Sequence, residues 1–142
     1  MSGKVQGFRF GAVSAGIRKD GRIDLALAVC DRPAVTAALF TRNLVKAAPV
    51  LVAAERASAG LSRAVLANAG CANAVTGEQG IRAVRETTAA IAKALGVSPE
   101  EVLPASTGVI GAHLPVEKIN LQAAALASKL TAEGHEDFAQ AI

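Results

Sequence analysis

Apolar runs separated by turn signals predict short strands in the first half of the chain. Residues 8–17 are rich in apolar and small side chains, and the Asp20-Gly21 pair that follows is typical of a hairpin turn. Residues 25–30 are continuously apolar, as in a strand that is covered on both faces. The run Asp31-Arg32-Pro33 is expected to break this strand. Two further strands are predicted, over residues 34–41 and 63–67.

Helical spacing predicts the helices that come next. A short helix is expected over residues 49–59, with Pro49 in its first turn. The run Thr76-Gly77-Glu78-Gln79 matches a capping box, in which the Thr and Gln side chains satisfy free backbone N–H groups. Side chains then recur at intervals of three and four residues, so a long helix is predicted up to a stop at Gly96.

The last third of the chain carries more helix signals. The run Ser98-Pro99-Glu100-Glu101 matches a second capping box and predicts a short turn before a strand. Residues 116–130 predict a long helix closed by Gly134, and Phe138 indicates a further helix. Strands and helices are intermixed without a repeat, so the predicted fold is one α/β domain over residues 1–142. Its apolar end predicts that the domain continues beyond residue 142, because domain ends are usually polar.

Composition narrows the classes of partner. A chain of 142 residues suits one domain, and a hydrophobic fraction of 51% suits a packed core. The net charge of +3 comes from charges scattered along the chain, which argues against a stripe that binds polyanions. With four Phe, no Trp and no Tyr, base stacking on single strands is not expected. We therefore expect no nucleic-acid partner.

Cysteine content and apolar run length indicate a reducing compartment. Cys30 and Cys71 are too few for a disulfide framework. Residues 1–6 lack the apolar region of a signal peptide. No stretch approaches the ~20 apolar residues that a membrane span requires, so no membrane partner is expected.

Common catalytic motifs are absent, and two loops remain as candidate sites. The sequence has no phosphate-binding loop, no Gly-x-Ser-x-Gly elbow and no His-Glu-x-x-His motif. His113 and His135 lack partners at metal-ligand spacing, so both are expected on the surface or in loops, with no metal site. Residues 68–77 join a predicted strand to a helix, where ligand crevices of α/β sheets lie. A simpler interpretation is a tight connection whose Asn side chains satisfy local backbone groups.

The second candidate loop, residues 104–111, places Thr107 and Gly108 at a predicted strand end. A Thr-Gly pair there can aim a hydroxyl and an unobstructed backbone N–H at one point, which suits a developing oxyanion. A Cβ at the glycine would crowd a reacting carbonyl. A β-bend that requires glycine for its backbone angles explains the same residues, so both interpretations stay open at this point.

The chain resembles the ornithine acetyltransferase family at six stretches that occur in the same order. One of them is Ser106-Thr107-Gly108-Val109-Ile110-Gly111. The others are residues 7–9, 21–27, 31–34, 43–50 and 68–80. The family usually has Asn where this chain has Cys71, and we expect the cysteine to be tolerated there as a small residue. No single stretch is decisive, but the ordered set is highly specific.

The resemblance implies a cytoplasmic enzyme made as one precursor that cleaves itself before a threonine. In the family, that threonine begins the β chain, takes the acetyl group from N-acetylornithine and passes it to glutamate. Some members also accept acetyl-coenzyme A, and no cofactor is implied beyond that substrate. The resemblance further implies a layered sheet-and-helix fold that the β chain completes, and assembly as an α2β2 heterotetramer.

Thr107 and Gly108 correspond to the oxyanion hole of the family. An amino-terminal threonine has its own amine as general base, and its acyl intermediate needs stabilised negative charge. The chain stops before the segments in which the family has its cleavage site and its substrate-contacting Thr and Lys. We therefore expect this α-chain portion to lack the nucleophile and to be active only with the β chain. Its own substrate-binding residues are not identified.

Two other interpretations of the chain stay open. An N-terminal-nucleophile aminopeptidase or amidase of related architecture would use the same oxyanion chemistry but release its acyl group to water. A ligand-binding or scaffold module would carry out no catalysis.

Overall fold

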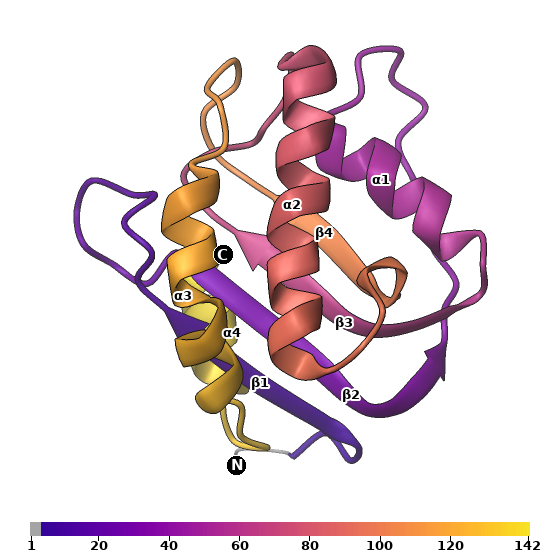
Figure 1. Ribbon diagram of the computed structural model, residues 1–142, viewed down its shortest axis with the longest axis vertical. Coiled ribbons are helices and arrows are strands. Elements are labelled where there is room, and N and C mark those ends of the chain that lie inside the picture. Colours follow the sequence, from indigo (N-terminus) through magenta and orange to yellow (C-terminus); the bar gives the residue numbers. More distant parts are fainter. Residues whose placement is uncertain (1–3) are drawn as a thin grey trace.

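Four strands form a single sheet in the order in which they occur along the chain (Figure 1). The computed structural model describes residues 4–142, so the first half of the amino-terminal segment considered above lies outside the described residues. The first two pairings are antiparallel and the third is parallel. The strands are β1 (Phe8–Val13), β2 (Leu25–Val35), β3 (Leu61–Asn68) and β4 (Val102–Ser106). The predicted α/β class is confirmed.

Three helices lie over one face of this sheet, and a shorter helix packs against the other face (Figure 1). Because successive strand residues point to opposite faces, Leu25, Leu27 and Val29 of β2 face the three-helix layer. Ala26, between them, packs with Ala141 of the short helix. The helices are α1 (Ala48–Ala57), α2 (Gly77–Leu95), α3 (Val116–Ser128) and α4 (His135–Ala141), with a 3₁₀ turn η1 (Pro99–Glu101).

The parallel pair β3–β4 is connected by α2, as a parallel pairing requires a crossover. Ile91 of α2 is fully buried between the sheet and the rest of the core. The helix ends as predicted, since Gly96 takes a left-handed backbone with φ of 68°. The second predicted capping box is confirmed at η1, where the Ser98 N–H donates to Glu101 Oε2 at 3.0 Å.

The first predicted capping box is wrong. The Thr76 hydroxyl makes no bond to the first turn of α2, because it donates to Oδ1 of Asn73 at 2.8 Å. The role predicted for Gly134 is also wrong, since α3 ends at Ser128 and Gly134 precedes α4. A Cβ on Gly134 would lie 2.2 Å from the backbone oxygen of Phe10, so this glycine lets the chain pass close to β1.

Two strand boundaries also differ from the prediction. Strand β2 continues through Pro33 to Val35, because an irregularity in its pairing with β3 between Val29 and Ala34 accommodates the proline. The strand predicted over residues 34–41 is therefore wrong, since residues 36–47 form no helix or strand. Strands β1 and β2 pair as the predicted hairpin, but β1 ends at Val13 and the connection is longer than a two-residue turn.

Candidate functional site

The two candidate loops lie side by side at the ends of the parallel strands β3 and β4. Asn68 and Ser106 are paired at these strand ends. Beyond them, the Ala72 N–H donates to the Val109 oxygen at 3.0 Å, and the Val109 N–H donates to the Gly70 oxygen at 3.3 Å. The structure thus brings residues 68–77 and 104–111 together at the carboxyl ends of parallel strands, where crevices in α/β sheets bind ligands.

Thr107 is exposed at this edge. Its N–H donates to the backbone oxygen of Asn68 at 2.9 Å, which extends the ladder between β3 and β4 by one bond. Its hydroxyl lies 3.4 Å from the same oxygen. That distance is long for a hydroxyl donor, so the hydroxyl can turn toward another acceptor at small cost.

Gly108 packs closely against the neighbouring loop. Its φ is +127°, and a Cβ there would lie 2.4 Å from the Gly70 carbonyl carbon and 2.6 Å from the Cys71 nitrogen. Both the backbone angle and the contact require glycine. Gly108 is exposed, and among residues 4–142 its N–H has no hydrogen-bond acceptor.

The N–H of an exposed residue that has no acceptor, next to a weakly held hydroxyl, can donate to a small anionic oxygen. The donors stand on a strand end that the sheet fixes, so they are ordered before any ligand arrives. The β-bend interpretation also fits the φ of Gly108, so the catalytic role of Thr107 and Gly108 stays a prediction.

Two buried asparagines hold the neighbouring loop. Asn68 is 4% exposed, and its side chain donates to the Cys71 oxygen at 2.9 Å and accepts from the Ser106 hydroxyl at 2.7 Å. Asn73 is fully buried, and its side chain donates to the Gly80 oxygen at 3.0 Å and accepts from Thr76. The expectation that these asparagines satisfy local backbone groups is confirmed for both.

Asp24, which is not among the predicted site residues, directly precedes β2 and supports the site. Its buried carboxylate accepts the N–H groups of Ala15, Ile17 and Arg18 at 2.7, 2.6 and 2.8 Å. It therefore shapes the β1–β2 connection, which lies against Gly70. An acidic residue directly before the apolar run of β2 was the available signal.

Cys71 lies within the core and is 3% exposed. Its Sγ donates to the Ala112 oxygen at 3.3 Å. The buried position agrees with the expectation of a small, tolerated residue in this loop. Cys30 is half-buried on β2, and both cysteines are free thiols.

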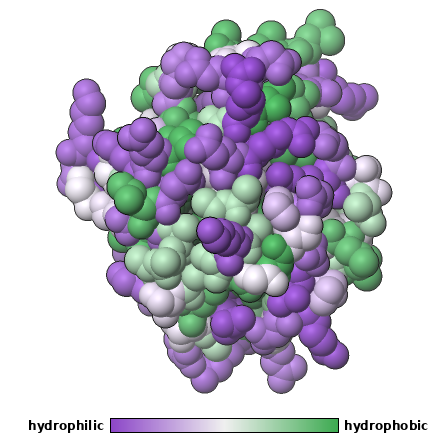
Figure 2. Space-filling model, viewed as in Figure 1, coloured by the Kyte–Doolittle hydropathy of each residue, from purple (hydrophilic) through white to green (hydrophobic). Residues whose placement is uncertain are grey.

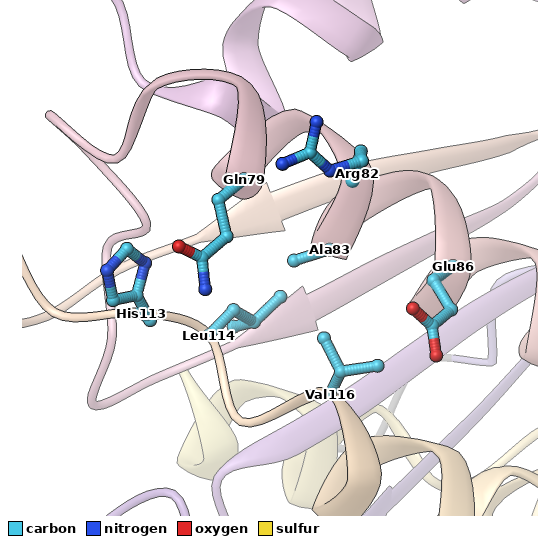
Figure 3. Close-up of a pocket in the computed structure, with 8 residues that line it drawn as sticks. Gln79, Arg82, Ala83, Glu86, His113, Leu114 and Val116 are labelled. Carbon is cyan, nitrogen blue, oxygen red and sulfur yellow. The ribbon is translucent and has the colours of Figure 1, made fainter.

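A shallow cavity of about 250 Å³ opens between the start of α2 and the segment that leads into α3 (Figure 3). Gln79, Arg82 and Glu86 line it from α2, and His113 and Leu114 line it from the facing segment. Figure 3 shows the Gln79 amide and the His113 ring on facing sides of this space. Neither Thr107 nor Gly108 lines the cavity.

The two histidines lie in different surroundings. His113 is exposed in a loop, as expected. His135 begins α4 and is half-buried beside Phe10.

The described part of the chain has neither a cluster of metal-binding side chains nor a helix suited to cross a membrane. Within residues 4–142, no group of three or more His, Cys, Asp and Glu side chains could hold a metal ion. No helix in the same range has both the length and the apolar content to cross a membrane.

Comparison with known proteins gave a family match over almost the whole chain. A sequence profile described as the ArgJ family matches residues 9–142. The arginine biosynthesis bifunctional protein ArgJ of Nitratidesulfovibrio vulgaris is 52% identical over 143 residues, which cover 100% of this chain and 36% of the relative. The protein of the same name from Geobacter sulfurreducens is 50% identical over 138 residues, which cover 97% of this chain and 35% of the relative.

Two solved structures have the same fold. The crystal structure of ornithine acetyltransferase from Mycobacterium tuberculosis, complexed with ornithine, matches with a TM-score of 0.92 at 40% identity. The match covers 96% of this chain and 75% of that one. The arginine biosynthesis bifunctional protein from Bacillus halodurans matches with a TM-score of 0.90 at 34% identity, covering 99% of this chain and 75% of that one. The chain therefore spans about a third of the length of the curated relatives and three quarters of each solved chain.

Proposed function

The chain belongs to the ArgJ family, and from this we propose that it is the amino-terminal portion of an acetyltransferase of arginine biosynthesis. The proposed reaction moves the acetyl group from N-acetylornithine to glutamate through an acetyl-threonine intermediate. The threonine belongs to the β chain, which the same precursor supplies by self-cleavage. In this proposal acetyl-coenzyme A is a second acetyl donor, and the reaction uses no cofactor.

The observation that carries this proposal is the exposed N–H of Gly108, which has no acceptor within residues 4–142, beside the weakly held Thr107 hydroxyl. In the proposed first step, the threonine oxygen attacks the acetyl carbonyl carbon, and negative charge develops on the carbonyl oxygen. Collapse breaks the C–N bond, and ornithine leaves with a proton from the threonine amine. The amine of glutamate then attacks the ester carbonyl carbon, the C–O bond to the threonine breaks, and N-acetylglutamate leaves. The proton lost by the glutamate amine passes through the threonine amine to the threonine oxygen. Thr107 and Gly108 donate to the oxygen in both steps, and each such donor contributes about 2.7–4 kcal/mol.

Exposed apolar side chains support the proposed partner chain. In the irregular segment before α1, Leu39 and Leu44 are fully exposed and Val45 is 66% exposed. Figure 2 shows apolar side chains along the upper right edge of the molecule, where Figure 1 places this segment. Exposed apolar groups in one segment are typical of a surface that another chain covers. We propose that the β chain does so, within an α2β2 heterotetramer located in the cytoplasm.

The test is turnover of the protein assembled with its β chain, supplied with N-acetylornithine and glutamate. We expect ornithine and N-acetylglutamate in equal amounts. Thr107→Val is expected to lower turnover on the order of 10²–10³-fold with folding intact, because one oxyanion donor is lost. Thr131→Val, at an exposed threonine in the loop after α3, is the matched control and should leave turnover unchanged.

Two results would contradict the proposal. Ornithine without N-acetylglutamate would indicate an aminopeptidase or amidase, since the acetyl group would have passed to water. Wild-type turnover in a folded Thr107→Val variant would remove Thr107 from the oxyanion site.

A further inference from the structure

Asn68 is the last residue of β3, and it connects the two loops of the candidate site. Its backbone oxygen accepts the Thr107 N–H at 2.9 Å, and its Oδ1 accepts the Ser106 hydroxyl at 2.7 Å. Every hydrogen bond that the Ser106 side chain and the Thr107 N–H make within residues 4–142 therefore ends on Asn68. The β3–β4 pairing fixes the strand end, and the Asn68 side chain adds the one bond that holds the Ser106 side chain next to Thr107.

The same side chain also fixes the opposite wall. Asn68 Nδ2 donates to the Cys71 oxygen at 2.9 Å, which holds the turn formed by Gly70 and Cys71. Gly108 packs against this turn so closely that a Cβ would overlap the Gly70 carbonyl carbon and the Cys71 nitrogen. The buried amide of Asn68 therefore bonds to both sides of the candidate site. It holds Ser106 at the end of β4, which carries the donors, and Cys71 in the turn that packs against Gly108.

We propose that Asn68 is a positioning residue for the oxyanion donors, and this inference rests on the proposed function. Its side chain is buried, and its hydrogen bonds within residues 4–142 go to Cys71 and Ser106. It acts through Ser106 and Cys71 by keeping the Thr107 hydroxyl and the Gly108 N–H aimed at one point. Since a displacement of about 1 Å at a reacting centre can cost 10²-fold in rate, loosening this connection lowers turnover without removing a donor.

Asn73 provides a matched comparison within the same loop. It is also a buried asparagine, and its side chain also makes one bond to a backbone oxygen and one to a hydroxyl. Its partners, Gly80 and Thr76, belong to the start of α2 and not to the segment that carries Thr107. Asn68 and Asn73 therefore share burial and bonding capacity and differ in what they position.

The experiment compares Asn68→Ala and Asn73→Ala in the protein assembled with its β chain, by measuring kcat and KM for N-acetylornithine. For Asn68→Ala we expect kcat to fall about 10–100-fold while KM stays within about twofold, because ground-state binding is retained. For Asn73→Ala we expect kcat within about threefold of wild type. Ser106→Ala should lower kcat by a smaller factor than Asn68→Ala, and Ser106→Thr, which keeps a hydroxyl, should restore it.

Equal losses of kcat in the two asparagine variants would overturn the inference, and so would a change confined to KM. If Asn68→Ala does not fold, the variants Ser106→Ala and Ser106→Thr test the inference instead. A kcat for Ser106→Ala equal to that of wild type would contradict positioning through the bond between Ser106 and Asn68. Thr107→Val, measured alongside, separates the two proposals. Wild-type turnover in Thr107→Val means that the proposed function fails, whereas a loss there with none in Asn68→Ala means that only the positioning role fails.

Discussion

Gly108 takes a backbone conformation that side chains rarely allow, in a place where no side chain fits. Its φ of +127° lies in the region that favours glycine, and the Gly70–Cys71 turn occupies the space of a Cβ. Gly111, three residues later, also has a positive φ of +83°, but nothing lies within 4 Å of its Cβ position. A side chain at Gly111 would therefore cause backbone strain alone, whereas a side chain at Gly108 would cause backbone strain and also overlap the adjacent turn.

At this scale we expect Gly108→Ala to abolish turnover and Gly111→Ala to retain most of it. Alanine at either position costs on the order of 1–3 kcal/mol in backbone strain, but only at Gly108 must the adjacent turn also move. Turnover and thermal unfolding of the assembled protein check this. Equal turnover in the two variants would show that the close contact at Gly108 is not needed.

Thr107 and Gly108 could be chosen as candidate site residues from the sequence, because a Thr-Gly pair suits an oxyanion and lies in a stretch that resembles the family. The hydrogen bonds of Asn68 could not be predicted from the sequence. Its main partner, Ser106, is 38 residues away, and only the parallel pairing of β3 with β4 brings the two together.

The ends of helices could be predicted where they depend on residues close together in the sequence. The stop of α2 at Gly96 and the capping box at Ser98 depend on residues within one turn of each other. The capping box at Thr76 failed because Asn73 competes for its hydroxyl. The continuation of β2 past Pro33 depends on an irregularity in its pairing with β3, which the sequence of β2 alone does not contain.

The β1–β2 connection gives a prediction at the scale of the element. Asp24→Asn is expected to lower the free energy of unfolding by about 3 kcal/mol, because a buried carboxylate that accepts three N–H groups loses its charge and an acceptor. Asp20→Asn, in the same connection but exposed and paired with Arg22, should leave the free energy of unfolding close to the wild-type value, because exposed ion pairs contribute little. Denaturant unfolding measures both. Equal small losses would contradict an organising role for Asp24.

At the scale of the whole molecule, the chain is an α/β layer with the candidate site at one edge of its sheet. The family follows from the ordered motifs, and the profile match over residues 9–142 confirms it. The donors proposed for the oxyanion lie at an exposed sheet edge, and fully exposed leucines occupy the segment before α1. The chain spans about a third of the length of its curated relatives. Exposed donors and exposed leucines agree with surfaces that the remaining part of such a protein would cover.

The most direct test of the account is a crystal structure of the assembled protein with the acetyl group trapped on the β-chain threonine. We predict that the acetyl oxygen lies about 2.7–3.1 Å from both the Gly108 nitrogen and the Thr107 hydroxyl oxygen, the range for oxyanion donors. An acetyl oxygen directed away from both groups, or an acetyl group carried by a different residue, would contradict the account.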